Sequence, residues 1–468
     1  MKRRTFLRTA TAVTAGSLAL PTIIPSHVIG KNPPSDKIQI AQIGCGRIAR
    51  SLDLPAVIKF DSARVIACCD LDKKRLRDGK ELIEELYTQK NGTRKYVDVK
   101  AYEDYRDIIQ RKDIDAIVIS TPDHWHVQPA IEAALAGKDI MLQKPFSLTI
   151  KEGRLLSDIV KKKGRVLQVC TQHRVSQQFR ITAELVRNGR IGKLHTVRVG
   201  FPGDPSGPDV AAASVPGNLN YDMWLGSTPE IPYREIGVHP QQDYSRPGWL
   251  RVHQFGAGAI TGTGQHYLDL AAWGMDTELT GPTMIEAVAE YPKSGLWDVH
   301  GDFMVKAEYE NGVTCYINSN YPVVIKYEGT EGWISAGPGA YKVTSSDPVP
   351  INRNAKILDA SNPDILGSVI KENEIHLYKA EDQHGNWLEC IKSRKPTISP
   401  EEIGHRSGSV CLLSDIAMKL GRRLFWDPAN EHFLNDDEAN KLLSRPQRKP
   451  YGTDYINFNS AVGGKQNS

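Results

Sequence analysis

The sequence predicts an α/β protein in which a doubly wound parallel sheet is followed by an α+β domain with a large, mostly antiparallel sheet. Two observations support this prediction. Short apolar runs alternate with helix-like segments from residue 38 to residue 169, which is typical of a parallel sheet. After Arg174 the alternation ends, and most later apolar runs read as successive strands. Because the chain has 468 residues, we expect two to three domains.

The first folded segment predicts a dinucleotide-binding turn. Ile38–Ile43 reads as a strand, and the run Gly-Cys-Gly-Arg-Ile-Ala that follows it opens a helix. This run matches the Rossmann fingerprint G-x-G-x-x-G/A, whose glycines let the backbone turn tightly and approach a pyrophosphate. We therefore predict an N-terminal Rossmann domain; a glycine-rich turn in another α/β protein is the alternative. The predicted cofactor contacts here are Gly44, Cys45, Gly46, Arg47 and Ile48.

A carboxylate at the end of the second predicted strand indicates the type of dinucleotide. This strand, Arg64–Cys69, ends at Asp70, close to the usual spacing for a carboxylate that binds the adenosine ribose hydroxyls. Asp70 favours NAD over NADP, because a 2′-phosphate would meet its negative charge. Lys73, Lys74 and Arg75 follow closely and soften that preference, so NADP stays open.

The alternation continues to residue 169, and two of its strands end in polar residues. The predicted elements are a helix over Lys73–Leu86, a strand near Tyr96–Val99, a helix over Tyr102–Gln110, a strand over Ile117–Ile119, a helix over Ala130–Ala136, a strand over Asp139–Leu142, a helix over Lys151–Lys163 and a strand over Val166–Val169. Open α/β sheets bind ligands at the carboxyl ends of their strands. We therefore predict further cofactor contacts at Thr121, Pro122, His124, His126, Gln143 and Lys144.

Lys144 is also the candidate acid/base group, because an amine next to the rigid Pro145 is fixed at the mouth of the crevice. A structural salt bridge is the alternative role for Lys144. His124 and His126 form an H-x-H pair, but no carboxylate or cysteine joins them at ligand spacing. We therefore expect no metal site.

The second half of the chain predicts the α+β domain. Its expected elements are a helix over Gln178–Asn188, a strand over Leu194–Gly200, a Pro/Gly-rich segment over Phe201–Pro247, strands over Thr283–Glu290, Asp302–Glu308 and Val313–Asn318, a loop-rich segment over Tyr341–Glu374, and helices over Trp387–Ser393 and Glu402–Leu420. The predicted organisation is an export signal over residues 1–30, the Rossmann domain over 36–165, the α+β domain over 166–451 and a polar tail over 452–468.

The N-terminal 30 residues predict export to the periplasm. Lys2, Arg3, Arg4 and Arg8 precede a mildly apolar run, and Arg-Arg-Thr-Phe-Leu resembles a twin-arginine signal, whose pathway carries folded proteins. A basic disordered terminus is the alternative. The four basic residues account for the net charge of +4, so the remainder is near neutral and gives no case for nucleic acid or anionic lipid. No later stretch reads as a membrane span, and the seven scattered cysteines read as buried thiols.

Several motifs together resemble the Gfo/Idh/MocA family (glucose-fructose oxidoreductase, inositol dehydrogenase, rhizopine catabolism). They are the glycine fingerprint, Thr121-Pro122-Asp123-His124-Trp125-His126, Lys144-Pro145, Thr171-Gln172-His173-Arg174, and Gly264-Gln265-His266 with Asp269. The resemblance implies NAD or NADP, a site between a Rossmann domain and a sheet domain, and sugars or polyols as substrates. It also implies a homo-oligomer, a dimer or tetramer, formed through the open face of the second sheet.

The resemblance also implies catalytic residues. Lys144 matches the catalytic lysine of a Glu-Lys-Pro motif, and His266 matches an active-site histidine. Two positions depart from the family: Gln143 replaces the glutamate, and Gly262 replaces a carboxylate found four residues before the histidine in many members. His266 then becomes the expected general base and Lys144 the alkoxide contact, with the roles exchangeable. A buried core histidine is the alternative for His266.

Four further residues are predicted to face the substrate. His173 and Arg174 follow a strand end, and Trp249 and Arg251 sit in the long loop region, whose aromatic faces suit sugar rings. Surface and packing roles are the alternatives for these residues.

We predict an exported NAD(P)-dependent oxidoreductase that oxidises a secondary hydroxyl of a sugar or glycoside, with C3 preferred. Because no free dinucleotide pool is expected outside the cytoplasm, the cofactor should be tightly bound, and either recycled in place or reoxidised by an unknown electron acceptor. The alternatives are redox-neutral glycoside cleavage or epimerisation through transient oxidation, and a non-catalytic sugar-binding protein.

Overall fold

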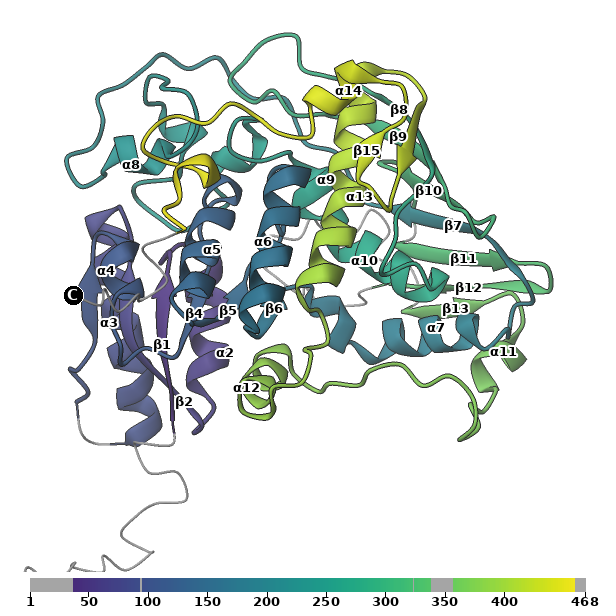
Figure 1. Ribbon diagram of the computed structural model, residues 1–468, viewed down its shortest axis with the longest axis horizontal. Helices are drawn as coiled ribbons and strands as arrows, with labels where there is room; N and C mark the ends of the chain where they lie inside the picture. Colours follow the sequence, from purple (N-terminus) through teal and green to yellow (C-terminus); the bar gives the residue numbers. More distant parts are fainter. Residues whose placement is uncertain (1–36, 93–94, 323, 338–356, 459–468) are drawn as a thin grey trace, which may run out of the picture. The chain divides into compact units, whose positions relative to one another are not determined.

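The computed structural model describes residues 37–92, 95–322, 324–337 and 357–458. The predicted export signal and the end of the predicted tail lie outside these ranges. Residues 38–458 contain both predicted sheets, as Figure 1 shows.

The first sheet has six parallel strands in the order β3-β2-β1-β4-β5-β6, the order of a dinucleotide-binding Rossmann sheet. The strands are β1 (Ile38–Ile43), β2 (Ala63–Cys69), β3 (Lys100–Tyr102), β4 (Ala116–Ile119), β5 (Asp139–Leu142) and β6 (Leu167–Val169). The parallel Rossmann sheet is thus confirmed, and through β6 it extends past residue 165. The strand predicted near residues 96–99 lies a few positions later in the chain, as β3.

Helices cover both faces of this sheet. They are α2 (Leu54–Ile58), α3 (Lys73–Asn91), α4 (Tyr105–Ile109), α5 (Val127–Leu135) and α6 (Ile150–Lys163). The helix after the glycine turn is irregular, because a π-helical turn, η2 (Ala49–Asp53), precedes α2. Its last residue, Asp53, is fully buried.

The second sheet has nine strands in the order β13-β12-β11-β7-β10-β9-β8-β14-β15. They are β7 (Leu194–Gly200), β8 (Met284–Ala289), β9 (Phe303–Glu308), β10 (Thr314–Asn318), β11 (Ile325–Gly329), β12 (Gly332–Ala336), β13 (Leu358–Ala360), β14 (Leu424–Asp427) and β15 (His432–Phe433). Only β7 and β10 pair in parallel among the described strands of this sheet, which confirms that it is mostly antiparallel. Strands β11 to β15 were not predicted, because each has at most five residues.

The C-terminal segment returns to the Rossmann sheet. Helix α12 (Gln383–Ser393) places Trp387 and Leu388 in the core that covers one face of β1 and β2. Helix α13 (Glu401–Leu420) contacts α6 and also β8 and α10 (Gly264–Met275), so it joins the two sheets (Figure 1). The predicted tail begins with packed residues, since Ile456 is buried in the core on the other face of the first sheet.

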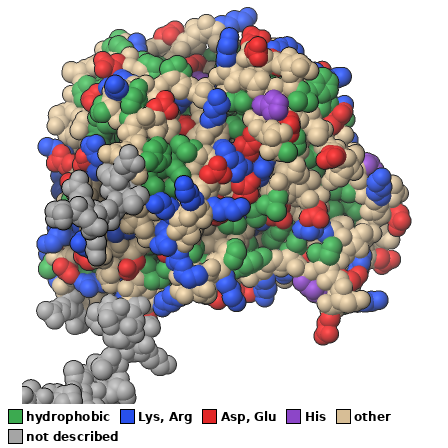
Figure 2. All heavy atoms as spheres, in the orientation of Figure 1, with side chains coloured by type: hydrophobic (Ala, Val, Ile, Leu, Met, Phe, Trp, Pro, Cys, Tyr) green, Lys and Arg blue, Asp and Glu red, His purple; other side chains and the backbone are tan. Residues whose placement is uncertain are grey.

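The distribution of charged side chains on the surface agrees with the near-zero net charge predicted for the chain after residue 30. On the face drawn in Figure 2, Lys and Arg side chains are interspersed with Asp and Glu side chains. All seven cysteines are free and buried, as predicted. Among the described residues, no helix has the length and apolar character needed to cross a bilayer.

Candidate active site

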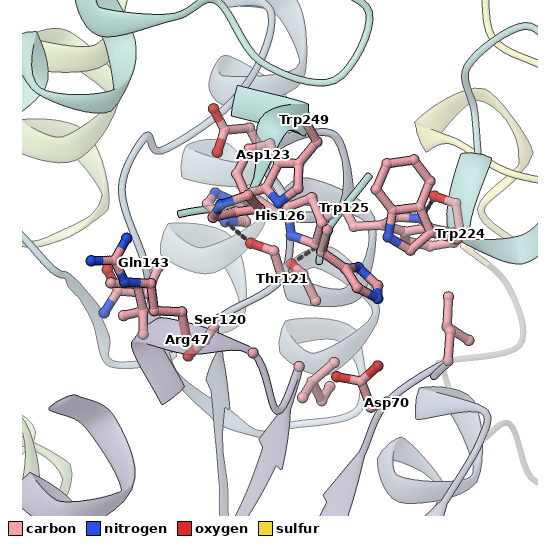
Figure 3. Close-up of a pocket in the computed structure, with 18 of the residues that line it drawn as sticks. Arg47, Asp70, Ser120, Thr121, Asp123, Trp125, His126, Gln143, Trp224 and Trp249 are labelled. Atoms are coloured by element: carbon pink, nitrogen blue, oxygen red, sulfur yellow. Dashed lines mark hydrogen bonds between the residues drawn. The ribbon is translucent and has the colours of Figure 1, made fainter. Parts of the chain in front are cut away.

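A cleft lies at the carboxyl edge of the first sheet and, with its mouth included, measures about 1340 Å³. Its floor is formed by the turns after β1, β2, β4 and β5, as the sequence predicted for a Rossmann fold. Part of it is shown in Figure 3. The predicted residues that line it are Gly44, Gly46, Arg47, Ile48, Asp70, Thr121, Pro122, His126, Gln143, Lys144 and Trp249.

The glycine turn leaves its backbone open to a ligand. Gly44 has a φ of +83°, and a Cβ there would lie 2.7 Å from the carbonyl oxygen of Ser120. At Gly46 the nearest atom to an added Cβ would be a guanidinium nitrogen of Arg75, at 3.9 Å. Position 44 therefore requires glycine, because its φ is positive and a Cβ would clash with Ser120 O. The absence of a side chain at Gly46 leaves space for a pyrophosphate to approach. Both features fit a bound dinucleotide.

Asp70 supports this turn as well as lining the cleft. One carboxylate oxygen accepts the backbone N–H of Cys45 at 2.7 Å, and the other accepts the N–H of Asp72 at 2.9 Å. Burial raises the pKa of Asp70, while these two hydrogen bonds oppose the rise. Each oxygen keeps a second lone pair for a ribose hydroxyl, so Asp70 fits its predicted role. Cys45, also predicted to contact the cofactor, does not line the cleft, because its side chain is buried and its N–H donates to Asp70.

Lys144 and Asp123 line the same cleft. The Lys144 ammonium donates to the carbonyl oxygen of Gly262 at 2.6 Å. Asp123 is 3% exposed, and burial raises its pKa to about 8, although the nearby Lys144 charge opposes the rise. A Cβ at Gly256 would lie 3.1 Å from the Asp123 carboxylate and 3.5 Å from the Trp249 ring, so these two side chains approach the same point. The sequence named Asp123 only as part of a motif.

The two histidines that follow β4 both lie close to backbone carbonyl oxygens. The ring nitrogens of His126 lie 2.6 Å from Pro145 O and 3.0 Å from Thr121 O, so the ring bridges the two cofactor-side turns. His124, predicted to contact the cofactor, does not line the cleft. Its Nε2 lies 2.8 Å from the carbonyl oxygen of Trp224, and burial lowers its pKa to about 3.

A segment of the second half, residues 239–250, covers the cleft; we call it the cover segment. It supplies six lining residues: His239, Ser245, Arg246, Pro247, Trp249 and Leu250. His239 lies 3.0 Å from the Asp72 carboxylate. Tyr244 donates to Asp78 at 2.9 Å, and its ring lies 4.6 Å from the Arg75 guanidinium. Of the six lining residues, only Trp249 was predicted. The contacts of His239 and Tyr244 were not predicted, because each joins positions more than 160 residues apart.

Comparison with known proteins gives the family. Residues 38–171 match "Oxidoreductase family, NAD-binding Rossmann fold", and residues 206–335 and 353–453 match "Oxidoreductase family, C-terminal alpha/beta domain". The chain belongs to the Gfo/Idh/MocA family. Its first domain is an NAD-binding domain, which agrees with the glycine turn and Asp70.

Individual relatives of the family match parts of this chain. Myo-inositol 2-dehydrogenase of Thermotoga maritima is 29% identical over 188 residues, 40% of this chain and 52% of that protein. Glycosyl hydrolase family 109 protein 2 of Shewanella sp. (strain ANA-3) is 30% identical over 206 residues, 41% of this chain and 44% of that protein. The chain thus spans about half the length of these relatives.

A solved structure supports the fold over most of the chain. The WlbA dehydrogenase from Bordetella pertussis, in complex with NADH and UDP-GlcNAcA, aligns with a TM-score of 0.59 at 17% identity. The alignment covers 84% of this chain and 99% of that one. At this identity the likeness concerns the fold.

Gln143 stands where the resemblance implied a glutamate, and its contacts give a local reason for the amide. The Gln143 amide donates to both oxygens of Asp53, at 2.9 and 3.0 Å. Asp53 also accepts from Ser120 at 2.6 Å, and His384 of α12 lies 3.1 Å from it. A glutamate at 143 would bring a second carboxylate against a fully buried one. Gln143 therefore connects the end of β5 to η2.

His266 does not line the cleft. Its side chain is fully buried, and within the described part of the chain neither ring nitrogen has a hydrogen-bond partner. Burial, with the charges of Lys144 and His173 adding to it, lowers its pKa well below the usual value. A fully buried histidine outside the cleft lining fits the alternative of a core histidine, and the base role of His266 stays a prediction.

Of the four residues predicted to face the substrate, only Trp249 lines the cleft. Arg174 is buried in an ion pair with Asp269, at 2.5 and 2.9 Å. The His173 ring packs against Phe179, His266 and Tyr267. Arg251 pairs with Asp204 at 3.0 Å and lies over Trp297. These three side chains have packing and ion-pair roles in the fold.

Proposed function

We propose that this protein oxidises a secondary hydroxyl of a sugar or glycoside by hydride transfer to NAD, with C3 of a glucoside as the preferred position. The observation that supports this best is Lys144, whose ammonium lies at the end of β5 in the same cleft as the glycine turn. Gly44, Gly46 and Asp70 would hold the dinucleotide, which when bound supplies the hydride acceptor. Lys144 stabilises the developing alkoxide, and Trp249 offers an aromatic face to the sugar ring.

Redox-neutral glycoside cleavage through transient oxidation is the second candidate. The cover segment favours it, because a dinucleotide in the cleft would be enclosed by residues 239–250 and retained between turnovers. The likeness to a glycosyl hydrolase family 109 protein points the same way. Release of the free sugar and its aglycone without net reduction of the retained NAD would support cleavage. A 3-keto product formed with stoichiometric NADH would support simple oxidation.

We also propose a periplasmic location and a homo-oligomer. The location rests on the twin-arginine-like N-terminus, and a fusion to a reporter active only after export tests it. The oligomer is supported by apolar side chains on the open face of the second sheet. Val288 and Met304 pair across β8 and β9 and are 56% and 49% exposed, and Phe425 on β14 is 53% exposed. Light scattering of the purified protein measures the assembly.

The test of function is the replacement Lys144→Ala, compared with Lys162→Ala at an exposed position of α6. Both variants should be purified without added dinucleotide and denatured, and the released dinucleotide identified by mass spectrometry. We expect Lys144→Ala to keep its NAD and to lose sugar oxidation by at least about 100-fold, because the alkoxide loses its cation. Unchanged turnover in Lys144→Ala would contradict the proposed role.

A further inference from the structure

Position 262 of the cleft lies beside Lys144 and carries no side chain. Gly262 lines the cleft, and a Cβ built there meets no atom within 4 Å. Its carbonyl oxygen accepts the Lys144 ammonium at 2.6 Å. A side chain at 262 would therefore extend into open space beside Lys144.

Most other proton acceptors of the cleft are engaged elsewhere. Within the described residues it is lined by two carboxylates, Asp70 and Asp123, and by two histidines, His126 and His239. Asp70 holds two backbone N–H groups at the glycine turn. His126 lies between two carbonyl oxygens, and His239 pairs with Asp72. Asp123 is the remaining group, and it lies within electrostatic range of Lys144.

We propose that Asp123 is the proton acceptor of the reaction. This inference rests on the proposed function. In the oxidative step the substrate O–H bond breaks and its proton passes to an Asp123 oxygen. The carbinol hydrogen leaves with two electrons to the nicotinamide, the C–O bond becomes C=O, and Lys144 keeps its proton throughout.

The surroundings of Asp123 suit this role near neutral pH. Burial disfavours its charged form and raises its pKa to about 8, while Lys144 opposes the rise. The groups that face it are Lys144 across the cleft, the Trp249 ring and the backbone at Gly256, and among these only Lys144 is charged. Because only the ionised form accepts a proton, the oxidation rate should increase with pH up to about 8 and then level off.

The kinetic test uses Asp123→Asn, which keeps the shape of the side chain. Reduction of retained NAD by sugar should be followed by stopped-flow absorbance at several pH values. We expect a rate about 100-fold to 1000-fold lower and a flat pH profile below pH 8. Asp158→Asn on α6, where Asp158 is 62% exposed, is the matched control and should behave as wild type. A wild-type rate and pH profile in Asp123→Asn would overturn the proposal.

A double variant and a spectroscopic measurement separate the loss of a proton acceptor from misfolding. The double variant Asp123→Asn, Gly262→Asp places a carboxylate beside Lys144. Its oxidation rate should be at least about tenfold higher than that of Asp123→Asn alone. A misfolded Asp123→Asn protein would not regain activity in this way. Independently of activity, infrared spectra should show a protonated-carboxyl band that titrates near pH 8 and is absent in Asp123→Asn. If the same band remained in Asp123→Asn, the titrating carboxyl group would not be Asp123 and the assignment would be overturned. An inactive wild type that shows the band would overturn the proposed function and still support Asp123 as the titrating group.

Discussion

Replacing Arg174 by methionine tests whether this residue stabilises the fold or binds the substrate. Its guanidinium donates to both oxygens of Asp269, at 2.5 and 2.9 Å, and to Glu278 at 2.7 Å. The side chains of Arg174 and Asp269 are 2% and 0% exposed. Arg174→Met leaves Asp269 charged and buried without its bidentate partner, and such a change costs about 3–5 kcal/mol.

The free energy of unfolding is measured by urea titration followed by tryptophan fluorescence. We expect Arg174→Met to lower it by about 3–5 kcal/mol, and the double variant Arg174→Met, Asp269→Leu to recover most of this loss, because both charges are then absent. The control is Arg423→Met, which removes a surface pair with Glu286 and should cost at most about 1 kcal/mol. A stable Arg174→Met protein with a raised KM for sugar would refute this reasoning and restore the substrate role.

Three further substitutions test the cofactor side of the cleft. Gly44→Ala should abolish dinucleotide retention, because the new Cβ meets Ser120 O and the residue has a positive φ; the measurement is the NAD released on denaturation. Gln143→Glu should lower the free energy of unfolding by about 2–4 kcal/mol, and Asp53→Asn in the same chain should suppress the loss, as urea titration would show. Asp70→Ala should shift the NAD-to-NADP affinity ratio toward NADP by about tenfold, measured by competitive binding; an unchanged ratio would contradict the ribose role.

The sequence predicts the cofactor side of the cleft because its signals are local. The glycine turn, Asp70 and the polar residues after β4 and β5 each follow a strand within a few positions, and the parallel order of those strands brings them to one edge. Lys144 was a candidate acid/base group from its place after β5, the resemblance added its match to a catalytic lysine, and the structure places this residue in the same cleft.

The substrate side was predicted less well, because its partners are distant in the chain. His173 and Arg174 follow β6, but the turn η4 (Gln172–Val175) is buried, and Arg174 meets an aspartate 95 positions later. A polar residue at a strand end can line a cleft or form a buried ion pair. Long-range contacts decide between these two outcomes, and a single sequence does not show them. The cover segment is an irregular Pro/Gly-rich loop with no periodic pattern, so its position over the cleft also had no sequence signal.

The anchoring of the cover segment bears on how the cofactor is used. Burial alone would raise the pKa of Asp72, but hydrogen bonds from His239 and Asn218 hold it below its usual value, so Asp72 is an ionised anchor for this segment. The Arg75 guanidinium adds a hydrogen bond to Pro240 O at 2.9 Å. If the segment must move for a dinucleotide to leave, these bonds must break first, which slows exchange. A dinucleotide that exchanges slowly would suit the proposed redox-neutral reaction, which restores the oxidised form within the same site.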